Sequence, residues 1–254
     1  MIRAALICLG LLLPGLATAQ ESIVAGLSQN RVSITADFDG SEILIYGAVK
    51  REAPSPRGVP LHVIITVEGP SAPVIVRRKE RQFGIWVNRD SVQVDRAPSF
   101  YAVATTGFLE EILSETENLR HQITIPRAIR AVGAVNQAAD APDFLEALLR
   151  IRTDEDRYRL AERTVHFTES TLFRADVILP ANLTEGPYRV RIFLTREGKV
   201  VDHFEQRINV RKEGLERWLT NLSRDQPLIY GVLSLFIAVV AGWGASSAFR
   251  LIRR

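Results

Sequence analysis

The sequence is poor in the residues that form covalent cross-links and thiol-based active sites. Its 254 residues contain one cysteine, Cys8, which lies in a segment that we expect to be removed. Beyond that segment no disulfide and no thiol nucleophile is possible, so stability has to come from a hydrophobic core. The chain also contains neither a P-loop nor a Gly-x-Ser-x-Gly nucleophile elbow. Its motifs therefore identify no reaction.

The histidines and the acidic residues do not predict a metal site. No two of the histidines have the i, i+4 spacing typical of metal ligands on one helix: they are His62, His121, His166 and His203. The acidic residues between 140 and 156 lack the pattern of an EF-hand, so a solvated face is expected there. We therefore predict no metal, no cofactor and no catalytic residue, and a protein that is not an enzyme.

An excess of charge of one sign is missing from most of the chain. The formal net charge is +3, and it comes from four arginines near the two ends, Arg3, Arg250, Arg253 and Arg254. Residues 20–227 carry 28 basic and 29 acidic groups. This balance argues against a nucleic-acid-binding domain, which would have a basic footprint. The hydrophobic content of 46% also excludes a disordered chain.

Two apolar segments predict the topology. Residues 1–19 have the pattern of a signal peptide, with a basic start, an apolar stretch and small residues before the cleavage point. Leu228 to Phe249 contains 22 residues and no charge, which corresponds to roughly 33 Å of helix, or one bilayer core. We expect a single-pass protein of the bacterial inner membrane, with a periplasmic main domain and a cytoplasmic basic tail at 250–254. An uncleaved N-terminal anchor and a buried soluble helix are the alternatives.

Two regions of the expected periplasmic part have the pattern of short strands. In residues 20–107 the expected strands are 32–36, 42–49, 61–68, 74–76, 83–87, 92–94 and 100–105. Turn-type residues at 37–41 predict a hairpin between the first two. In residues 164–212, Tyr188, Val190, Ile192 and Leu194 share one face, and the turn at 196–199 predicts a half-buried hairpin.

Residues 108–163, between these regions, have the period of helices. We expect one helix at 108–119, a second at 143–152 after Pro142, and a third that begins at the capping pair Thr153 and Asp156 and continues through Arg163. The predicted fold is mainly β with a helical insertion: one or two Ig-like antiparallel β-sandwich units plus a single C-terminal transmembrane helix. The pattern leaves open whether the β regions form one sandwich or two.

Residues 213–227 form the predicted connection to the span at 228–249. Apolar residues recur there at helical spacing over Glu213 to Arg224, which predicts a short amphipathic juxtamembrane helix. Trp218 is expected to anchor it at the membrane interface. A rigid stalk against the headgroups and a specific docking helix are the two interpretations.

The densest basic cluster consists of Arg77, Arg78, Lys79 and Arg81, and Trp86 follows it. Guanidinium groups bind oxyanions in a bidentate manner, so an anion site is one hypothesis. Neighbours on a strand point to opposite faces, however, and the four side chains therefore cannot all converge. A solvated edge strand with basic residues and a surface for a protein partner are the other interpretations.

Small residues recur every four positions within the predicted span, at Ala238, Gly242 and Ser246. Small residues let helix backbones approach closely, which makes these three the candidate residues for helix association in the membrane. The partner would be a membrane protein or a second copy of the chain. A plain anchor is the alternative.

The chain resembles the alphaproteobacterial putative transmembrane protein family. The resemblance is carried by residues 40–43, 46–48, 77–81, 84–88, 172–175, 179–183 and 186–190. It implies a signal peptide, an exported domain and a C-terminal span, with no assigned activity, catalytic residue or cofactor. It further implies genomic proximity to sulfite-exporter-type permeases, and hence an accessory role in transport.

Three classes of function remain open. We expect a membrane-anchored periplasmic accessory or interaction protein without catalytic activity, which assists such a permease. A periplasmic anion-binding sensor or solute-capture domain at the cluster of residues 77–81 is the alternative. An exported enzyme with an unrecognised site is the third.

Overall fold

A computed structural model describes residues 21–35, 38–51, 58–133, 140–212, 219 and 222–252. At 212 and 247–252 the description covers only the backbone. The predicted signal peptide, Trp218 and most of the predicted amphipathic helix lie outside the described residues.

One sheet of the fold has four antiparallel strands. Their order is β1 (Glu21–Leu27), β3 (Gly40–Arg51), β10 (Leu172–Pro180) and β9 (His166–Thr168). Residues on β10 alternate between buried and exposed, with Phe173 and Val177 among the buried ones. This alternation means that one face of the sheet packs against the core and the other faces solvent.

The second sheet has six strands. Their order is β2 (Arg31–Ile34), β12 (Lys199–Lys212), β11 (Gly186–Arg196), β4 (Leu61–Glu68), β7 (Tyr101–Thr105) and β8 (Tyr158–Ala161). The outermost pairs, β2 with β12 and β7 with β8, are parallel, and the inner pairs are antiparallel.

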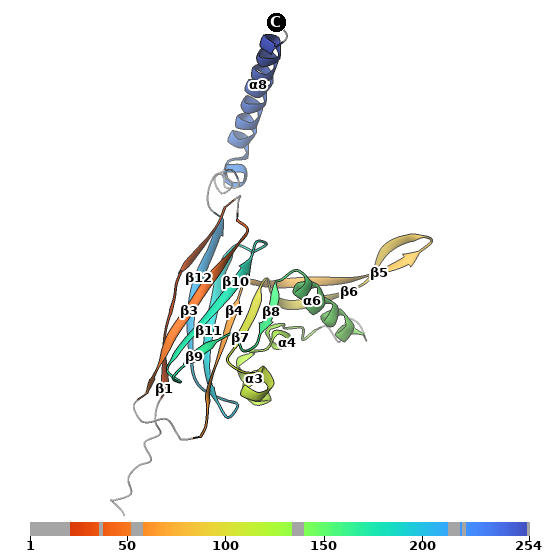
Figure 1. Cartoon of the computed structure of the whole chain (residues 1–254). Helices are drawn as coiled ribbons and strands as arrows, with labels where there is room; N and C mark the ends of the chain where they lie inside the picture. Colours follow the sequence, from red (N-terminus) through yellow and green to blue (C-terminus); the bar gives the residue numbers. More distant parts are fainter. Residues whose placement is uncertain are drawn as a thin grey trace, which may run out of the picture.

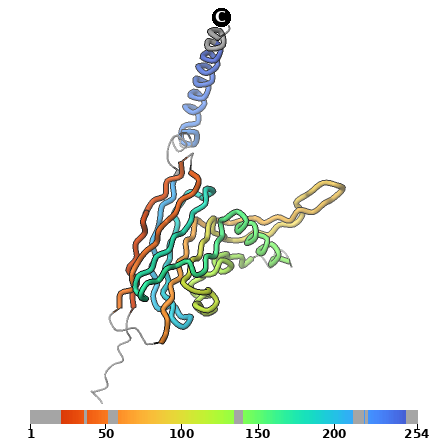
Figure 2. Tube along the Cα trace, in the orientation of Figure 1, coloured from red at the N-terminus to blue at the C-terminus, as the bar shows by residue number. Residues whose placement is uncertain are grey.

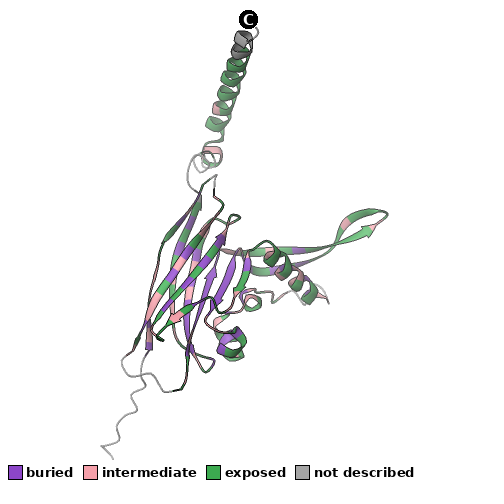
Figure 3. Cartoon of the chain, viewed as in Figure 1, coloured by how far each residue is buried: buried purple, intermediate pink, exposed green. Residues whose placement is uncertain are grey.

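The two sheets pack face to face into one β-sandwich (Figure 1). Each sheet contains strands from both predicted β regions, so these regions form one sandwich and not two. The core between the sheets includes Ile45, Phe173, Val190 and Ile192. Burial follows the sandwich strands, as the purple segments in Figure 3 show. The prediction of a mainly β fold with a helical insertion and a C-terminal apolar helix is confirmed.

Three short helices cover the outer face of the six-stranded sheet. They are α2 (Leu109–Ile112), α3 (Glu115–His121) and α4 (Ile125–Ala128), and they pack on Ile64, Tyr101, Val103 and Phe193. Phe193 is only 1% exposed although it lies on the face of β11 opposite Val190. The prediction that this hairpin is half-buried therefore holds at Arg189 and Arg191, which are only partly buried, and is wrong at Phe193, where the helical layer covers the second face of β11.

A long hairpin leaves the sandwich, and we call it the arm. It consists of β5 (Ser71–Gln82) and β6 (Ile85–Pro98), which form a two-stranded sheet with each other. At its base, Arg96 of β6 also forms a single antiparallel bridge with Arg130. Figure 2 shows that the arm projects away from the sandwich, with α6 (Ala141–Asp154) beside its root. The predicted strand at 83–87 is wrong at its start, because Phe83 and Gly84 form the turn of the arm.

Three further predictions of local structure are corrected. The hairpin around 37–41 does not form, because β2 and β3 lie in different sheets. The helix at 108–119 is divided, because Ser114 is extended and caps α3 through a hydrogen bond from the Glu117 amide. The helix expected from Thr153 to Arg163 is absent: α6 ends at Asp154, Asp156 is left-handed with φ 57°, and β8 then pairs with β7.

The C-terminal helix α8 (Pro227–Ile252) extends beyond the end of the sandwich at which β12 finishes (Figure 1). Its stretch from Pro227 to Ser246 has a mean hydropathy of 2.1, and none of the most apolar window is buried within the chain. Within the described part of the chain, it is the one helix long and apolar enough to cross a bilayer.

Candidate functional site

The root of the arm is held by a small hydrophobic core of its own. Val76, Val92 and Val94 of the arm are buried against Phe144 and Leu148 of α6. A two-stranded hairpin is marginally stable in water unless a further element covers it. α6 supplies that cover, so the arm leaves the sandwich from a packed root.

Arg78 also stabilises the root of the arm, through polar and cation–π contacts with α6 and the residue before it. Its guanidinium donates a hydrogen bond of 2.6 Å to Asp140, just before α6, and lies 3.6 Å from Asp143. The same group lies 4.6 Å from the centre of the Phe144 ring, in a cation–π contact. Arg78 therefore faces α6 and is occupied in holding the arm.

Beyond this root, the arm has solvent on both faces. Residues 77–91 are exposed, apart from Gln82 and Val87, which are half-buried. The apolar residues at its end are nevertheless large: Phe83 is 105% exposed, Ile85 64% and Trp86 68%. Large exposed apolar side chains gathered at one place mark a binding surface more often than isolated ones do.

The turn at the tip has an unusual residue. Gln82 pairs with Ile85, so Phe83 and Gly84 form a two-residue turn, and both have positive φ, 50° and 87°. Such turns favour Asn-Gly, because Asn and Gly tolerate the left-handed region at little cost. A bulky residue such as Phe is conformationally strained in this region, which indicates that its side chain has a role other than stabilising the fold.

The register of the arm sorts the basic cluster by face. Arg77 pairs with Ser91, Lys79 with Asn88 and Arg81 with Trp86. Directly paired residues share a face, and alternate residues on β5 do too, so these three cations lie on one face together with Trp86. We call this set, Arg77, Lys79, Arg81 and Trp86, the cationic face.

The opposite face of the arm carries the two acidic residues of its exposed part, Glu80 and Asp90. Arg78 pairs with Asp90 across the hairpin, and Glu80 pairs with Val87. A register shift beside Arg78 leaves Arg89 as the extra residue of β6, and Arg89 bonds Glu80 at 2.7 Å. On this face Arg89 thus forms an ion pair with Glu80, and Arg78 forms one with Asp140, whereas the cations of the cationic face form no ion pair with any described residue.

The spacing of the cationic face determines what it can bind. Alternate residues on a strand are about 6.8 Å apart, so the three cations extend along a line of about 14 Å. Side chains so spaced do not converge on one small oxyanion. The predicted basic cluster is therefore divided: Arg78 belongs to the root, and the others form an extended row.

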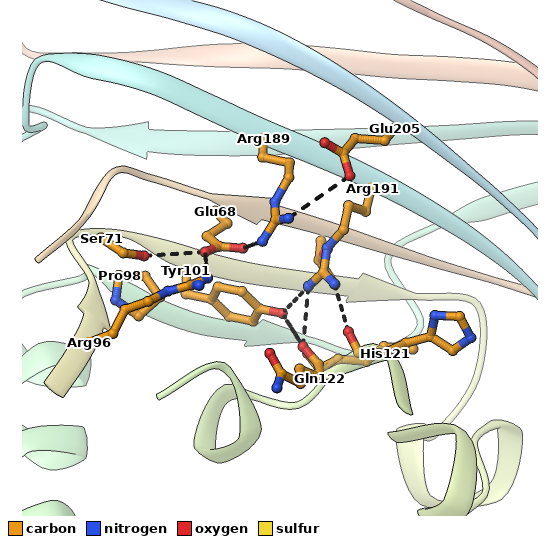
Figure 4. A network of polar contacts seen from close by, with 12 residues as sticks. Glu68, Ser71, Arg96, Pro98, Tyr101, His121, Gln122, Arg189, Arg191 and Glu205 are labelled. Carbon is orange, nitrogen blue, oxygen red and sulfur yellow. Dashed lines mark hydrogen bonds and ion pairs between the residues drawn. The ribbon is translucent and has the colours of Figure 1, made fainter. Parts of the chain in front are cut away.

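A second group of charged residues lies in a cleft of about 400 Å³ beside the root of the arm. Glu68, at the end of β4, is 6% exposed and accepts hydrogen bonds from Arg96, Arg189 and Ser71 (Figure 4). Arg207 pairs with Arg189 across β11 and β12 and also lines the cleft. The cleft is therefore richer in arginine than in acid.

The arginines around Glu68 determine its charge state. Burial by itself would raise the pKa of Glu68, but the hydrogen bond and charge of Arg189, with the charges of Arg191 and Arg96, outweigh it and hold the pKa below its ordinary value. Glu68 is thus an ionised carboxylate that its neighbours neutralise.

Arg191 connects this network to the helical layer. It donates to the carbonyls of His121, at 2.7 Å, and Gln122, at 3.2 Å, at the end of α3, and to the Tyr101 hydroxyl at 2.9 Å (Figure 4). A cation at a helix C-terminus satisfies free carbonyls and complements the helix dipole. Burial raises the pKa of Tyr101, and similarly that of Tyr158 to about 12. These phenols therefore stay protonated and act as hydrogen-bond donors.

Sequence reasoning missed the cleft. The alternation on β11 does place Arg189 and Arg191 on the face away from the core, but their acidic partner is distant in the sequence. Arg189 and Glu68 are separated by 121 positions, and only the pairing of β4 with β11 brings them together.

The other predicted site residues are placed as follows. Ala238, Gly242 and Ser246 lie on one face of α8 through their spacing of four. Apart from the adjacent backbone of α8 itself, no described atom lies within 4 Å of the position that a Cβ of Gly242 would occupy, so helix association at this face stays a prediction. Among the described residues, no group of three or more His, Cys, Asp or Glu side chains is close enough to hold a metal ion.

A family model matches the chain over residues 22–251, from β1 to the end of α8. The family is described as "Putative transmembrane protein (Alph_Pro_TM)". Searches of curated proteins and of solved structures find no match.

Proposed function

Because the chain belongs to the alphaproteobacterial putative transmembrane protein family, we propose that it is a membrane-anchored protein that acts by binding and does not catalyse a reaction. α8 is its single described candidate span, in agreement with the family. The observation that carries the proposal is the arm. It combines a packed root with an end that exposes Phe83, Ile85 and Trp86, and burial of such an end against another component of the membrane would remove its apolar surface from water.

The proposal includes an orientation and a partner. The sandwich lies on the periplasmic side, since a signal peptide at 1–19 would export it and α8 would then stop the transfer. The basic residues at 250–254 suit the cytoplasmic face. The binding partner is an integral membrane transporter, in particular a sulfite-exporter-type permease, and the chain serves it as an accessory protein.

Photo-crosslinking in native membranes tests this proposal. The full chain carries p-benzoylphenylalanine at Phe83 in the arm, at Val239 in α8, or at Tyr46 as a control. Tyr46 is an exposed aromatic residue (49%) on the four-stranded sheet. We expect a discrete crosslinked membrane protein, identified by mass spectrometry as a transporter, from Val239 or Phe83 and none from Tyr46.

Two outcomes would contradict the proposal. If neither Val239 nor Phe83 gives a discrete protein product, the chain is not an interaction protein of the kind proposed. If Tyr46 gives the same product in the same yield, the capture reflects crowding and not a binding surface.

Anion capture is the second candidate function, and the arginine cleft is the observation that favours it. Arg96, Arg189 and Arg207 line one cavity, whereas the cations of the cationic face form a row. Titration of the full chain with sulfite, sulfate and phosphate by calorimetry tests this candidate. We expect saturable binding that Arg207→Gln weakens, and no heat of binding in wild type would eliminate it.

A further inference from the structure

The distal arm, residues 77–91, is a cationic segment of a nearly neutral protein. It contains five basic and two acidic residues, a net charge of +3, whereas residues 20–227 as a whole have slightly more acidic than basic groups. Arg78 and Arg89 bond acidic residues. The remaining excess is therefore the row of Arg77, Lys79 and Arg81, which is complementary to an extended anionic surface and not to one ion.

The apolar residues of the arm lie at the end of this row. Trp86 pairs with Arg81, and Phe83 and Ile85 lie on either side of Gly84. Trp is enriched where a hydrocarbon phase meets polar headgroups. Apolar residues at the tip with cations behind them are the arrangement by which a peripheral segment enters a membrane interface with anionic lipids.

The connection between β12 and α8 keeps the arm close to the bilayer that α8 spans. β12 ends at Lys212 and α8 begins at Pro227. Residues 222–225 between them are helical, so this connection spans at most about 40 Å. β5, with 12 residues, is about 40 Å long. A tether of this length raises the effective concentration of the spanned bilayer around the arm, so weak contacts suffice for docking.

We propose that the arm docks on the anionic phospholipid headgroups of the bilayer that α8 spans, through its cationic face, with Phe83 and Trp86 in the interface. This inference rests on the proposed function, since it names what the arm contacts. The sandwich then has two attachments to the membrane, α8 and the arm, and its orientation over the bilayer is restricted.

Quenching of Trp86 by brominated lipid tests the proposal on the full chain. In the variant with Trp218→Phe and Trp243→Phe, Trp86 is the remaining tryptophan. The chain is reconstituted in vesicles of brominated phosphatidylcholine, alone or mixed with phosphatidylglycerol. We expect strong quenching with phosphatidylglycerol, weak quenching without it, and a decrease at high salt, because ions screen contacts between exposed charges.

Neutralising the row measures its contribution. Each exposed cation near an anionic surface strengthens binding roughly fivefold, so the variant with Arg77→Gln, Lys79→Gln and Arg81→Gln should lower the docking equilibrium constant roughly 100-fold. The matched control removes three exposed cations of the sandwich instead, through Arg31→Gln, Lys50→Gln and Lys199→Gln, and should leave the quenching of Trp86 unchanged. Inorganic phosphate should displace the arm no more than chloride of the same ionic strength does.

Phe83→Asn separates docking from folding. Asn suits the left-handed position of this turn better than Phe, so the hairpin should keep its hydrogen-exchange protection while the quenching of Trp86 falls. In a second variant all three native tryptophans are replaced and Tyr46→Trp introduces a single one on the sandwich. Its quenching by brominated lipid gives the background level for a residue that is not part of the arm.

The outcomes separate this proposal from the broader one. Equal quenching with and without phosphatidylglycerol, or quenching that survives the triple substitution at residues 77, 79 and 81, overturns the lipid contact. If Trp86 is unquenched in every vesicle while Phe83 crosslinks a membrane protein, the arm binds a protein; the lipid proposal is then wrong and the proposed function stands.

Discussion

Phe144→Ala is expected to release the arm without unfolding the sandwich. Phe144 is 3% exposed and belongs to the cluster that joins α6 to Val76 and Val92 of the arm. That cluster shares no buried residue with the core between the sheets or with the core under the helical layer, and only the partly buried Ile129 packs against both it and the latter core. The substitution therefore removes packing from one unit of the molecule and leaves the two larger cores intact.

The magnitude follows from the packing. Truncation of a buried Phe costs about 3–5 kcal/mol. The contact of Phe144 with Arg78 adds little, because the Arg78 side chain is 42% exposed and exposed cation–π contacts contribute about 0.5–1 kcal/mol. We take the lower end, about 3 kcal/mol, which corresponds to a loss of protection of roughly 100-fold.

Hydrogen exchange read by mass spectrometry on the full chain measures this loss. Peptides from β5, β6 and α6 should exchange roughly 100-fold faster in the variant, whereas peptides from β4 and β11 should be unchanged. Ile151→Ala is the matched control, since Ile151 is on the same helix and 47% exposed, and it should change stability by less than about 0.5 kcal/mol. If β4 and β11 lose protection to the same extent as the arm, the two units unfold together and the reasoning is refuted.

Three further predictions concern the sandwich. Glu68→Gln should lower the free energy of unfolding by about 2 kcal/mol in a denaturant titration, because it leaves two partly exposed arginines without their buried carboxylate; an unchanged midpoint would contradict this. Gly47→Ala should cost about 1–3 kcal/mol in thermal unfolding, because the new Cβ would lie 2.4 Å from the Phe173 ring, and an unchanged Tm would show that the sheet yields. Burial lowers the pKa of His62 and of His121 below 6.5, so the unfolded chain binds protons more readily, and stability present at about pH 7 should decline toward about pH 5; a rising Tm would contradict this sign.

The alternation of side chains along a strand predicted that the basic cluster is divided between two faces, but not which residues share the cationic face. Alternation along a strand does predict that Arg78 faces away from Arg77 and Lys79, and the structure agrees. The residues of the cationic face could not be predicted from the sequence, because Phe-Gly is not the usual signal of a two-residue turn. The position of the turn sets which residues of the two strands pair, and without that register the sequence does not place Trp86 beside Arg81.

The helical region shows a different reason for error. The capping pair Thr153 and Asp156 predicts a helix through Arg163, but Tyr158 is 2% exposed under the helical layer and its strand pairs with β7. A local preference for helix is worth a few tenths of a kcal/mol per residue and is easily outweighed by burial of a large aromatic side chain. The family resemblance predicted from seven short segments is confirmed over residues 22–251.

The sequence by itself determined which faces of the strands are buried and which helix is apolar enough to span a bilayer. Both properties follow from the local order of side chains: alternation on β10 and on β11 as far as Ile192, and the absence of charge along the apolar stretch of α8. Only the tertiary structure decided that the β regions form one sandwich, that Glu68 meets Arg189, and that three cations and Trp86 share one face of an arm. These features depend on strand partners and register, which are set by contacts between distant segments and leave no local pattern.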